Sequence, residues 1–460
     1  MKIHFISIGG SVMHQLAIAL TKKGYHVSGS DDEIFEPARG NLAREGILPE
    51  AVGWFPEKIN ASLDAVILGM HAREDNPELQ RARELKLPIY SFPEYIYRES
   101  TNKTRVVVGG SHGKTTTTSM IMHVLRHAQM EFDYLVGARL EGFEQSVNIT
   151  DAPVIVCEGD EYPASTIEKR PKFHFLFPHI AVLTGIAWDH INVFPTFDIY
   201  LEQFRIFISK IESGGYLVYN ETDPVLNELV NKEKRDDLHY LPYGIPANQI
   251  SSGVTTVTID GSETELKVFG NHNLLNLHAA WLVCSRLGVT AGQFTAAMAG
   301  FTGASKRLEL LASNDDVIFF RDFAHAPSKV IATIDAVRKQ YPGRRFIAVL
   351  ELHTYSSLNE AFLSNYRGAL DAADEAAVFY SRHALEIKRM PDLHPDVVAA
   401  GFGKKDLAVF NERPQLEEWL SARDYRNSVV VFMSSGNYDG LDAERFSKGI
   451  TQPAINFGQE

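Results

Sequence analysis

The run of residues 105–116, RVVVGGSHGKTT, constrains the fold of this chain more than any other segment. Four β-favouring residues precede a glycine turn, and a Gly-Lys-Thr sequence leads into residues able to begin a helix. Glycines let a backbone approach an anion, and the N–H groups at a helix start point toward it. Lys114 adds a mobile positive charge. The run therefore predicts a strand, a phosphate-binding loop and a helix, with an ordinary strand-to-helix turn as the alternative.

The loop is a compact variant of the common nucleotide-binding pattern. The general form G-x-x-x-x-G-K-[ST] requires a first glycine at the position that Val108 occupies here. The tighter G-x-x-G-K-T fits from Gly110 to Thr115. A hydroxyl directly after the lysine is placed to ligate the Mg²⁺ that accompanies a nucleoside triphosphate, so we expect Thr115 to be a metal ligand.

Composition bounds the class of protein. At 460 residues the chain is long enough for about three domains of roughly 150 residues each. A net charge of −13 disfavours a broad nucleic-acid surface. Cys157 and Cys284 lie in apolar runs, which predicts buried free thiols and a reducing compartment. With no signal-peptide pattern and no apolar run near the roughly 20 residues of a membrane span, we expect a soluble cytoplasmic protein without membrane insertion.

Strand-like and helix-like segments alternate along the chain, which is typical of a parallel α/β fold. A polar stretch at 99–103 predicts a linker, and a basic pair at 306–307 ends the next block. The predicted domains are residues 1–102, 103–307 and 308–460. Expected helices cover 13–23 and 77–85, and a hairpin covers 255–268. Expected strands cover 3–8, 25–30, 65–70, 89–91, 105–108, 154–157, 180–184, 317–320, 345–350, 376–380 and 429–433.

Acidic and histidine residues follow two of the expected strands. Glu158, Asp160 and Glu161 come after strand 154–157, and the pair Asp189-His190 comes after strand 180–184. Ligands of open α/β sheets gather at the carboxyl ends of the strands. A carboxylate there can reach a bound Mg²⁺, and an Asp-His pair can supply a metal ligand with an orienting carboxylate. A solvated acidic turn and a structural cap are the alternatives.

Further polar residues stand in the last two blocks. Asn273 and Asn276 offer the donors and acceptors that suit an adenine edge, although a helix start rich in capping residues explains them equally well. The basic pair at 306–307 either clamps phosphates across a domain cleft or is a solvated pair. Asp322 and His325 follow the expected strand 317–320 at its carboxyl end.

The order of these motifs resembles that of the Mur ligase family over nearly the whole chain. Phosphate loop, acidic turn, Asp-His, Asn-x-x-Asn, basic hinge and Asp-x-x-His occur in the family's succession. The resemblance implies an α/β fold of three domains: an N-terminal Rossmann-like UDP-binding domain, a central P-loop ATPase domain and a C-terminal Rossmann-like domain. It also implies a ligase that uses ATP and Mg²⁺ to activate a carboxylate as an acyl phosphate, which an amine then attacks.

The resemblance also implies roles by position. ATP-binding residues would be Gly110, Ser111, His112, Gly113, Lys114, Thr115, Thr116, Asn273, Asn276 and Arg307. Metal ligands would be Thr115, Glu158 and His190, with Glu161 in reserve. Catalytic residues would be Lys114, His190, Arg307, Asp322 and His325. Contacts to the UDP-sugar would be Gly9, Gly10, Ser11, Ser30, Asp31 and His71.

Several positions depart from the family. Gly185 stands where most relatives have asparagine, and Ala326 replaces the second histidine of a usual pair. Arg205 occupies the position where some relatives carry a carbamylated lysine, so that modification is not expected here.

The resemblance bears on the amine substrate as well. Stretches around Tyr162 and Phe323 resemble members that join UDP-N-acetylmuramate to the tripeptide L-alanyl-γ-D-glutamyl-meso-diaminopimelate in peptidoglycan recycling. Thr354 and Ser357 replace two arginines thought to hold L-alanine in other members, so we expect the tripeptide to be the amine. His353 resembles the L-alanine-adding members, which makes L-alanine the alternative. A folate-type ligase and, outside the ligases, an ATP-driven switch module are more distant alternatives.

Overall fold

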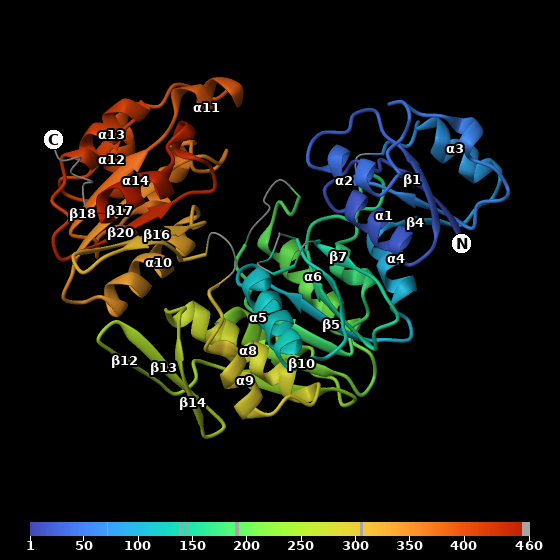
Figure 1. The fold of residues 1–460 in the computed structure, drawn as a ribbon, viewed down its shortest axis with the longest axis horizontal. Helices are drawn as coiled ribbons and strands as arrows, with labels where there is room; N and C mark the ends of the chain where they lie inside the picture. The colour runs from blue at the N-terminus through green and yellow to red at the C-terminus, as the bar shows by residue number, and fades with distance from the viewer. Residues whose placement is uncertain are drawn as a thin grey trace, which may run out of the picture. The chain divides into compact units, whose positions relative to one another are not determined.

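The computed structural model describes residues 1–70, 72–137, 140, 142–143, 145–188, 193–303 and 307–452. The chain divides into two compact units. The first comprises Met1–Pro246, Ile259–Ser262 and Leu275–Met298. The second comprises Ala247–Thr258, Glu263–Leu274 and Ala299–Glu460. Two large sheets belong to the first unit and one belongs to the second (Figure 1).

The N-terminal sheet has four parallel strands in the order β2-β1-β3-β4. Its strand β3 is buried on both faces, because Ala65 and Ile67 pack in one cluster with helix α1 while Val66 and Leu68 pack in another with α3. Strand β1 ends earlier than expected, since Ser7 turns the chain with φ +66°. The elements are β1 (Lys2–Ile6), β2 (His26–Ser30), β3 (Ala65–Leu68), β4 (Ile89–Ser91), α1 (Met13–Lys22), α2 (Ala38–Arg44), α3 (Pro77–Glu84) and α4 (Phe92–Glu99).

The central sheet has seven strands in the order β11-β10-β9-β5-β8-β6-β7. All neighbours are parallel except β6 and β7. The strands are β5 (Thr104–Gly109), β6 (Asp133–Leu135), β7 (Val147–Asn148), β8 (Val154–Glu158), β9 (Ile180–Leu183), β10 (Tyr216–Asn220) and β11 (His239–Tyr243). The helices that follow along the chain are α5 (Lys114–His127), α6 (Phe197–Ser209), α7 (Pro224–Lys232), α8 (Asn271–Arg286) and α9 (Ala291–Met298).

The polar stretch at 99–103 connects these two sheets, as expected of a linker, but two of its residues are buried. Ser100 is buried, and its carbonyl accepts a hydrogen bond from Arg105 Nη1 at 2.9 Å. Lys103 is also buried and forms an ion pair with Asp133 at 2.8 Å. Because the polar groups of Ser100 and Lys103 find partners inside the protein, these two residues pack the connection against the domain.

A small sheet of β12 (Asn248–Ser251), β13 (Val254–Ile259) and β14 (Ser262–Leu266) follows. Asp260 and Gly261 both have positive φ, 44° and 83°, as a two-residue type I′ turn requires. The expected hairpin is therefore confirmed, and β12 adds a strand that the sequence did not indicate.

The C-terminal sheet has six strands in the order β15-β16-β20-β17-β18-β19, with only β15 antiparallel to its neighbour. Along β17, alternate residues face α10 and the pair α13 and α14, so helices cover both faces; α10 and α14 lie on opposite sides of the sheet in Figure 1. The strands are β15 (Glu309–Ser313), β16 (Val317–Asp322), β17 (Arg345–Glu351), β18 (Glu375–Phe379), β19 (Ala408–Phe410) and β20 (Ser428–Met433). The helices are α10 (Pro327–Gln340), α11 (Arg382–Ile387), α12 (Pro395–Phe402), α13 (Arg413–Ser421) and α14 (Ala443–Thr451).

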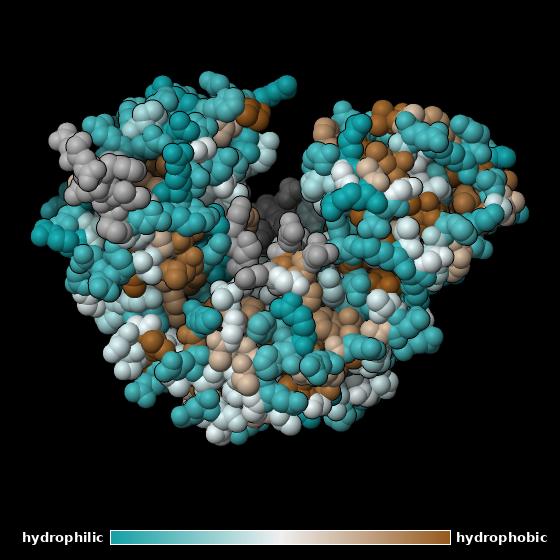
Figure 2. Space-filling view, in the orientation of Figure 1, coloured by the Kyte–Doolittle hydropathy of each residue, from teal (hydrophilic) through white to brown (hydrophobic). Residues whose placement is uncertain are grey.

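The surface is mainly polar. On the face shown in Figure 2, hydrophilic residues predominate and hydrophobic ones are interspersed among them. Phe35 and Tyr355 are among the large apolar side chains that stay exposed, at 70% and 64%. Within the described residues, none of the helices has the length and apolar character needed to cross a bilayer.

Candidate functional site

The strand–loop–helix predicted for 105–116 is confirmed. Strand β5 ends at Gly109 and α5 begins at Lys114. Gly110 and Gly113 have φ +126° and +80°, which favour glycine. A Cβ on Gly110 would lie 2.1 Å from Thr184 Oγ1, and one on Gly113 would lie 2.4 Å from Asn276 Oδ1. The loop is therefore packed so closely that neither glycine is replaceable without rearrangement.

The ammonium group of Lys114 lies between this loop and the acidic turn after β8. Its Nζ donates to Gly110 O at 2.6 Å and to Glu161 Oε2 and Oε1 at 2.8 and 3.1 Å. Burial by itself lowers the pKa of Lys114, but the carboxylates of Glu161, Asp160 and Glu158 outweigh it and raise the pKa above its usual value. Lys114 is therefore charged and anchored.

Thr115 and Glu158 bring oxygen ligands together beside the loop. Thr115 Oγ1 donates to Glu158 Oε1 at 2.8 Å, and Gly137 N donates to Glu158 Oε2 at 3.0 Å. A hydroxyl and a carboxylate at this spacing fit a hard cation such as Mg²⁺. His190, the third expected ligand, lies outside the described residues together with Asp189. Within the described residues, no three His, Cys, Asp or Glu side chains form a metal-binding cluster.

The hydroxyl of Ser111 is held from two sides. Its Oγ accepts a hydrogen bond from Ala187 N at 2.8 Å and lies 2.9 Å from the hydroxyl of Tyr200. Tyr200 comes from α6 and is fully buried. Sequence reasoning did not single it out, because only the fold brings α6 to the loop. Arg205, on the same helix, is half exposed and forms an ion pair with Glu202.

The two asparagines of α8 differ in their contacts. Asn276 Oδ1 accepts a hydrogen bond from Thr117 Oγ1 at 3.2 Å, which joins α8 to the helix of the phosphate loop. Asn273 Nδ2 donates to Phe269 O at 2.8 Å, a local bond at the start of the helix. Asn273 is therefore engaged in a side-chain to main-chain bond within its own segment, whereas Asn276 lies at the phosphate loop.

The N-terminal glycine turn is fixed by an aspartate. Gly9 N donates to Asp31 Oδ2 at 2.7 Å. Burial raises the pKa of Asp31 to about 6, against the opposing effect of that hydrogen bond. Ser30 is fully buried, and its carbonyl accepts a hydrogen bond from Ser7 N at 2.9 Å. This bond holds the start of the turn against strand β2. His71 lies outside the described residues.

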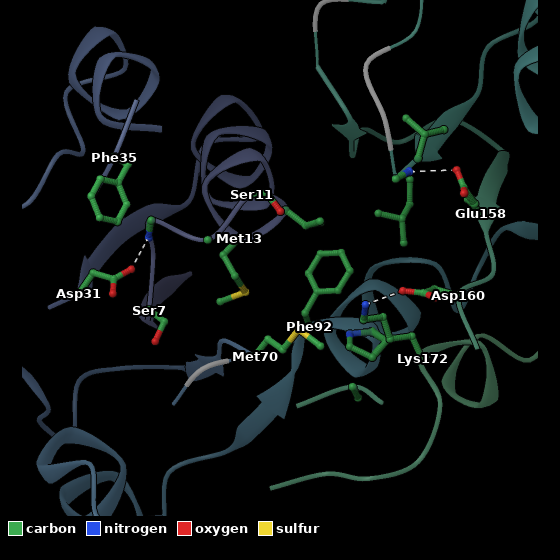
Figure 3. A pocket seen from close by; sticks show the side chains of 18 of the residues that line it. Ser7, Ser11, Met13, Asp31, Phe35, Met70, Phe92, Glu158, Asp160 and Lys172 are labelled. Carbon is green, nitrogen blue, oxygen red and sulfur yellow. Dashed lines mark hydrogen bonds and ion pairs between the residues drawn. The ribbon is translucent and has the colours of Figure 1, made fainter. Parts of the chain in front are cut away.

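A cavity of about 620 Å³ joins the N-terminal turn to the phosphate loop within the first unit. Asp31 and Phe35 lie at one end, Glu158 and Asp160 at the other, and Met13 between them (Figure 3). Its remaining lining residues are Ser7, Gly9, Gly10, Ser11, Val12, Asp32, Glu33, Met70, Phe92, Pro93, Lys114, Leu135, Val136, Gly137, Ala164, Lys172 and Leu176. Ser30 does not line it.

In the second unit, Arg307, Asp322 and His325 are brought together. The buried carboxylate of Asp322 accepts from Leu308 N and Ala324 N, both at 2.7 Å. The guanidinium of Arg307 lies 4.9 Å from the centre of the Phe323 ring, which contacts His325 edge-on at 5.2 Å. Asp322 therefore shapes the chain around Arg307.

The carboxyl edge of the C-terminal sheet also holds a buried carboxylate that sequence reasoning did not select. Glu351 Oε2 accepts from Tyr438 N at 2.9 Å and from the Ser434 hydroxyl. Burial raises the pKa of Glu351 despite these bonds and the nearby His353. The following loop closes on itself, because Thr354 Oγ1 lies 3.0 Å from the Ser357 hydroxyl.

Known proteins match this chain along most of its length. Family models match residues 2–102 (Mur ligase family, catalytic domain), 108–284 (Mur ligase middle domain) and 306–436 (Mur ligase, glutamate ligase domain). The UDP-N-acetylmuramate–L-alanine ligase of Mycobacterium marinum is 30% identical over 405 residues, covering 82% of this chain and 80% of the relative. The ligase of the same name from Carboxydothermus hydrogenoformans is 27% identical over 458 residues, covering 97% and 96%.

Solved structures share the fold. MurC, the UDP-N-acetylmuramate-alanine ligase of Thermotoga maritima, matches with a TM-score of 0.67 and 23% identity, covering 98% of this chain and 99% of that one. The UDP-N-acetylmuramate:L-alanyl-γ-D-glutamyl-meso-diaminopimelate ligase (MPL) of Neisseria meningitides has a TM-score of 0.59 and 26% identity, covering 65% and 98%. The three-domain α/β architecture expected from the sequence is thereby confirmed. This chain belongs to the Mur ligase family and is an ATP-dependent ligase that forms a C–N bond.

Proposed function

We propose that this enzyme joins the carboxyl group of UDP-N-acetylmuramate to the amino group of L-alanine in peptidoglycan synthesis. The curated relatives quoted above carry this activity in their names and align over most of both chains. They favour L-alanine over the tripeptide expected from the sequence. The structural observation that supports the proposal is the cavity that runs without interruption from the N-terminal glycine turn to Lys114 and Glu158.

The cavity suits a substrate with a nucleotide at one end and a carboxylate at the other. Gly9, Gly10 and Ser11 precede α1, where backbone N–H groups can hold a diphosphate. Asp31 fixes this turn through Gly9. We assign the nucleoside to the Asp31 end and the reacting carboxylate to the Lys114 end, with the domains divided at residues 102/103 and 307/308.

The chemistry requires a better leaving group than oxide. Transfer of the terminal phosphoryl group of ATP to the carboxylate forms an acyl phosphate, and attack by the amine forms the amide and releases phosphate. Residues Ser111 to Thr116 would hold the phosphates, with Lys114 neutralising the charge that develops on them. Thr115, Glu158 and His190 would hold Mg²⁺, which supplies further charge neutralisation when bound. Asn273, Asn276, Arg307, Asp322 and His325 would complete the nucleotide and amine sites.

One observation favours the tripeptide as a second candidate. Thr354 and Ser357 stand where arginines are thought to hold L-alanine, and their side chains bond to each other. Without those two cations the loop has less charge for a small free carboxylate, whereas a longer peptide distributes its binding over more contacts.

The decisive experiment measures phosphate release from ATP in the presence of UDP-N-acetylmuramate, with L-alanine or the tripeptide as the amine. A higher kcat/KM for L-alanine supports the proposal. A higher value for the tripeptide assigns the second activity. Phosphate release that depends on neither amine nor UDP-sugar identifies a nucleotide-driven switch and contradicts both.

A further inference from the structure

The acidic turn after β8 contains two glutamates with separate contacts. Glu158 lines the cavity and binds the Thr115 hydroxyl and Gly137 N. Glu161 does not line the cavity and is fully buried, and both its carboxylate oxygens lie within 3.1 Å of Lys114 Nζ. Of the two glutamates, therefore, Glu158 faces the space where substrate and metal would bind. Glu161 instead contacts Lys114, and Lys114 lines that space.

The Lys114 ammonium is held in a defined position by this arrangement. A lysine side chain is flexible, and fixing its ammonium group in one place costs rotamer entropy. Glu161 on one side and Gly110 O on the other hold Nζ at the phosphate loop through contacts within the protein. Because the two Glu161 oxygens belong to one carboxylate, one N–H can maintain the ion pair while another turns to a phosphate.

We propose that Glu161 is the positioning residue for Lys114 and that it is not a metal ligand. Its carboxylate holds the ammonium at the phosphate loop, so that the positive charge is in place when phosphoryl transfer begins. The inference rests on the proposed function, in which Lys114 serves the phosphates of ATP. It assigns the two glutamates of the turn to different partners: Glu158 to the metal and Glu161 to the lysine.

A matched control is available in the same domain. Lys103 and Asp133 form a second buried pair, with the same 2.8 Å separation as Lys114 and Glu161. Neither residue lines the cavity. Asp133→Asn therefore removes a buried carboxylate from a lysine without touching the site.

The test is a double-mutant cycle with Glu161→Gln and Lys114→Met, each measured alone and together. For each variant we would measure kcat, the Kd of a non-hydrolysable ATP analogue, and the Mg²⁺ midpoint. Glu161→Gln is expected to lower kcat about 100-fold, as misplacement of a reacting group can, with an unchanged Mg²⁺ midpoint. In the Lys114→Met background, Glu161→Gln should not lower kcat further and should not weaken binding of the ATP analogue further. Asp133→Asn should lower Tm while leaving kcat and Kd unchanged.

Three results would overturn the inference. They are a Mg²⁺ midpoint that shifts in Glu161→Gln as it does in Glu158→Gln, losses that add in the double variant, and a loss of kcat in Asp133→Asn equal to that in Glu161→Gln. If Glu161→Gln does not fold, Glu161→Asp takes its place, because it keeps the charge but withdraws it from Lys114. Wild-type turnover in Lys114→Met would instead contradict the proposed function of the loop, a result that the cycle separates from the others.

Discussion

The central domain contains two buried lysine–carboxylate pairs that are chemically alike and structurally different. Lys103–Asp133 and Lys114–Glu161 have the same 2.8 Å separation, and both carboxylates are at most 1% exposed. Lys103 Nζ also donates to two main-chain carbonyls inside the protein, at 2.8 and 2.7 Å. Lys114 instead binds one carbonyl of a phosphate loop and lines a cavity. The surroundings therefore give Lys103 a structural role and leave Lys114 available to a substrate.

The first pair ties segments that are distant in sequence. The carbonyls that Lys103 binds belong to Thr150 and Ala152, and Asp133 also accepts from Thr150 N at 2.8 Å. Lys103 thus fastens the connection between two sheets to the strand β6 and the loop before β8. The second pair fastens a single side chain at the site. We expect stability to depend on the first pair and the rate of ligation to depend on the second.

The largest expected effect comes from Lys114→Ala. Removing this charge should lower kcat by on the order of 100-fold or more, since preorganised charges at a transferring group commonly contribute that much. Affinity for the UDP-sugar should change little, because its nucleotide end is assigned to the N-terminal turn. Steady-state kinetics and calorimetric titration with UDP-N-acetylmuramate measure the two quantities. If Lys114→Ala turned over close to the wild-type rate, the Lys114–Glu161 pair would have no catalytic role to distinguish it from the Lys103–Asp133 pair.

Lys103→Met should act on stability instead. Leaving Asp133 as an unpaired buried charge is expected to lower the free energy of unfolding by about 3 kcal/mol or more. Denaturant unfolding measures this loss, and kcat per folded molecule should stay unchanged. Replacing both partners with Lys103→Met and Asp133→Leu should recover part of the stability. A variant that loses kcat without losing stability would show that the two pairs do not divide these tasks.

Glu158→Gln sharpens the comparison within the acidic turn. Glutamine keeps the shape of the side chain but loses the charge that a hard cation requires. The Mg²⁺ concentration at half-maximal activity is expected to rise on the order of tenfold. Magnesium titrations at saturating ATP provide the measurement. An unchanged midpoint would return the Thr115–Glu158 contact to a purely structural role.

His174 shows what happens when a buried basic group has a neutral partner. Its Nε2 lies 2.8 Å from Gln203 O, and burial lowers the pKa of the ring to about 4 from 6.5. The folded state therefore resists protonation, so stability is full above pH 6.5 and declines as the pH falls toward 4. Between pH 7.5 and 5.5 the loss from this group should be about 1.4 kcal/mol.

The comparison with His174→Phe tests this contribution. Denaturant unfolding of the wild type and the variant at pH 7.5 and 5.5 gives the difference for each protein. The variant is expected to show a smaller decrease in stability on acidification. An identical decrease in both proteins would exclude His174 as its source.

The parts of the fold that the sequence predicted are those that depend on local chemistry. Apolar runs such as 345–350 and 429–433 became central strands, because a parallel strand covered on both faces accommodates such continuous hydrophobicity. The phosphate loop was recognisable because its shape depends on residues that are close together in the sequence, including Gly110 and Gly113. The short strands β12 and β15 were missed, since all the residues of β12 are exposed and only Leu311 of β15 is buried, so neither has a strong apolar pattern.

The sequence by itself determined the three-domain α/β architecture, the phosphate loop and the family of ligases, because these follow from short-range patterns and from the order of motifs. The tertiary structure decided which charges meet. Lys114 and Glu161 are 47 positions apart, and the hydroxyls of Ser111 and Tyr200 are 89 apart. The sequence around Lys103 does not show whether this segment is exposed or buried. Its burial depends on whether acceptors distant in the sequence bind the ammonium group of Lys103. Contacts across such separations depend on how strands and helices pack, which short sequence patterns do not encode.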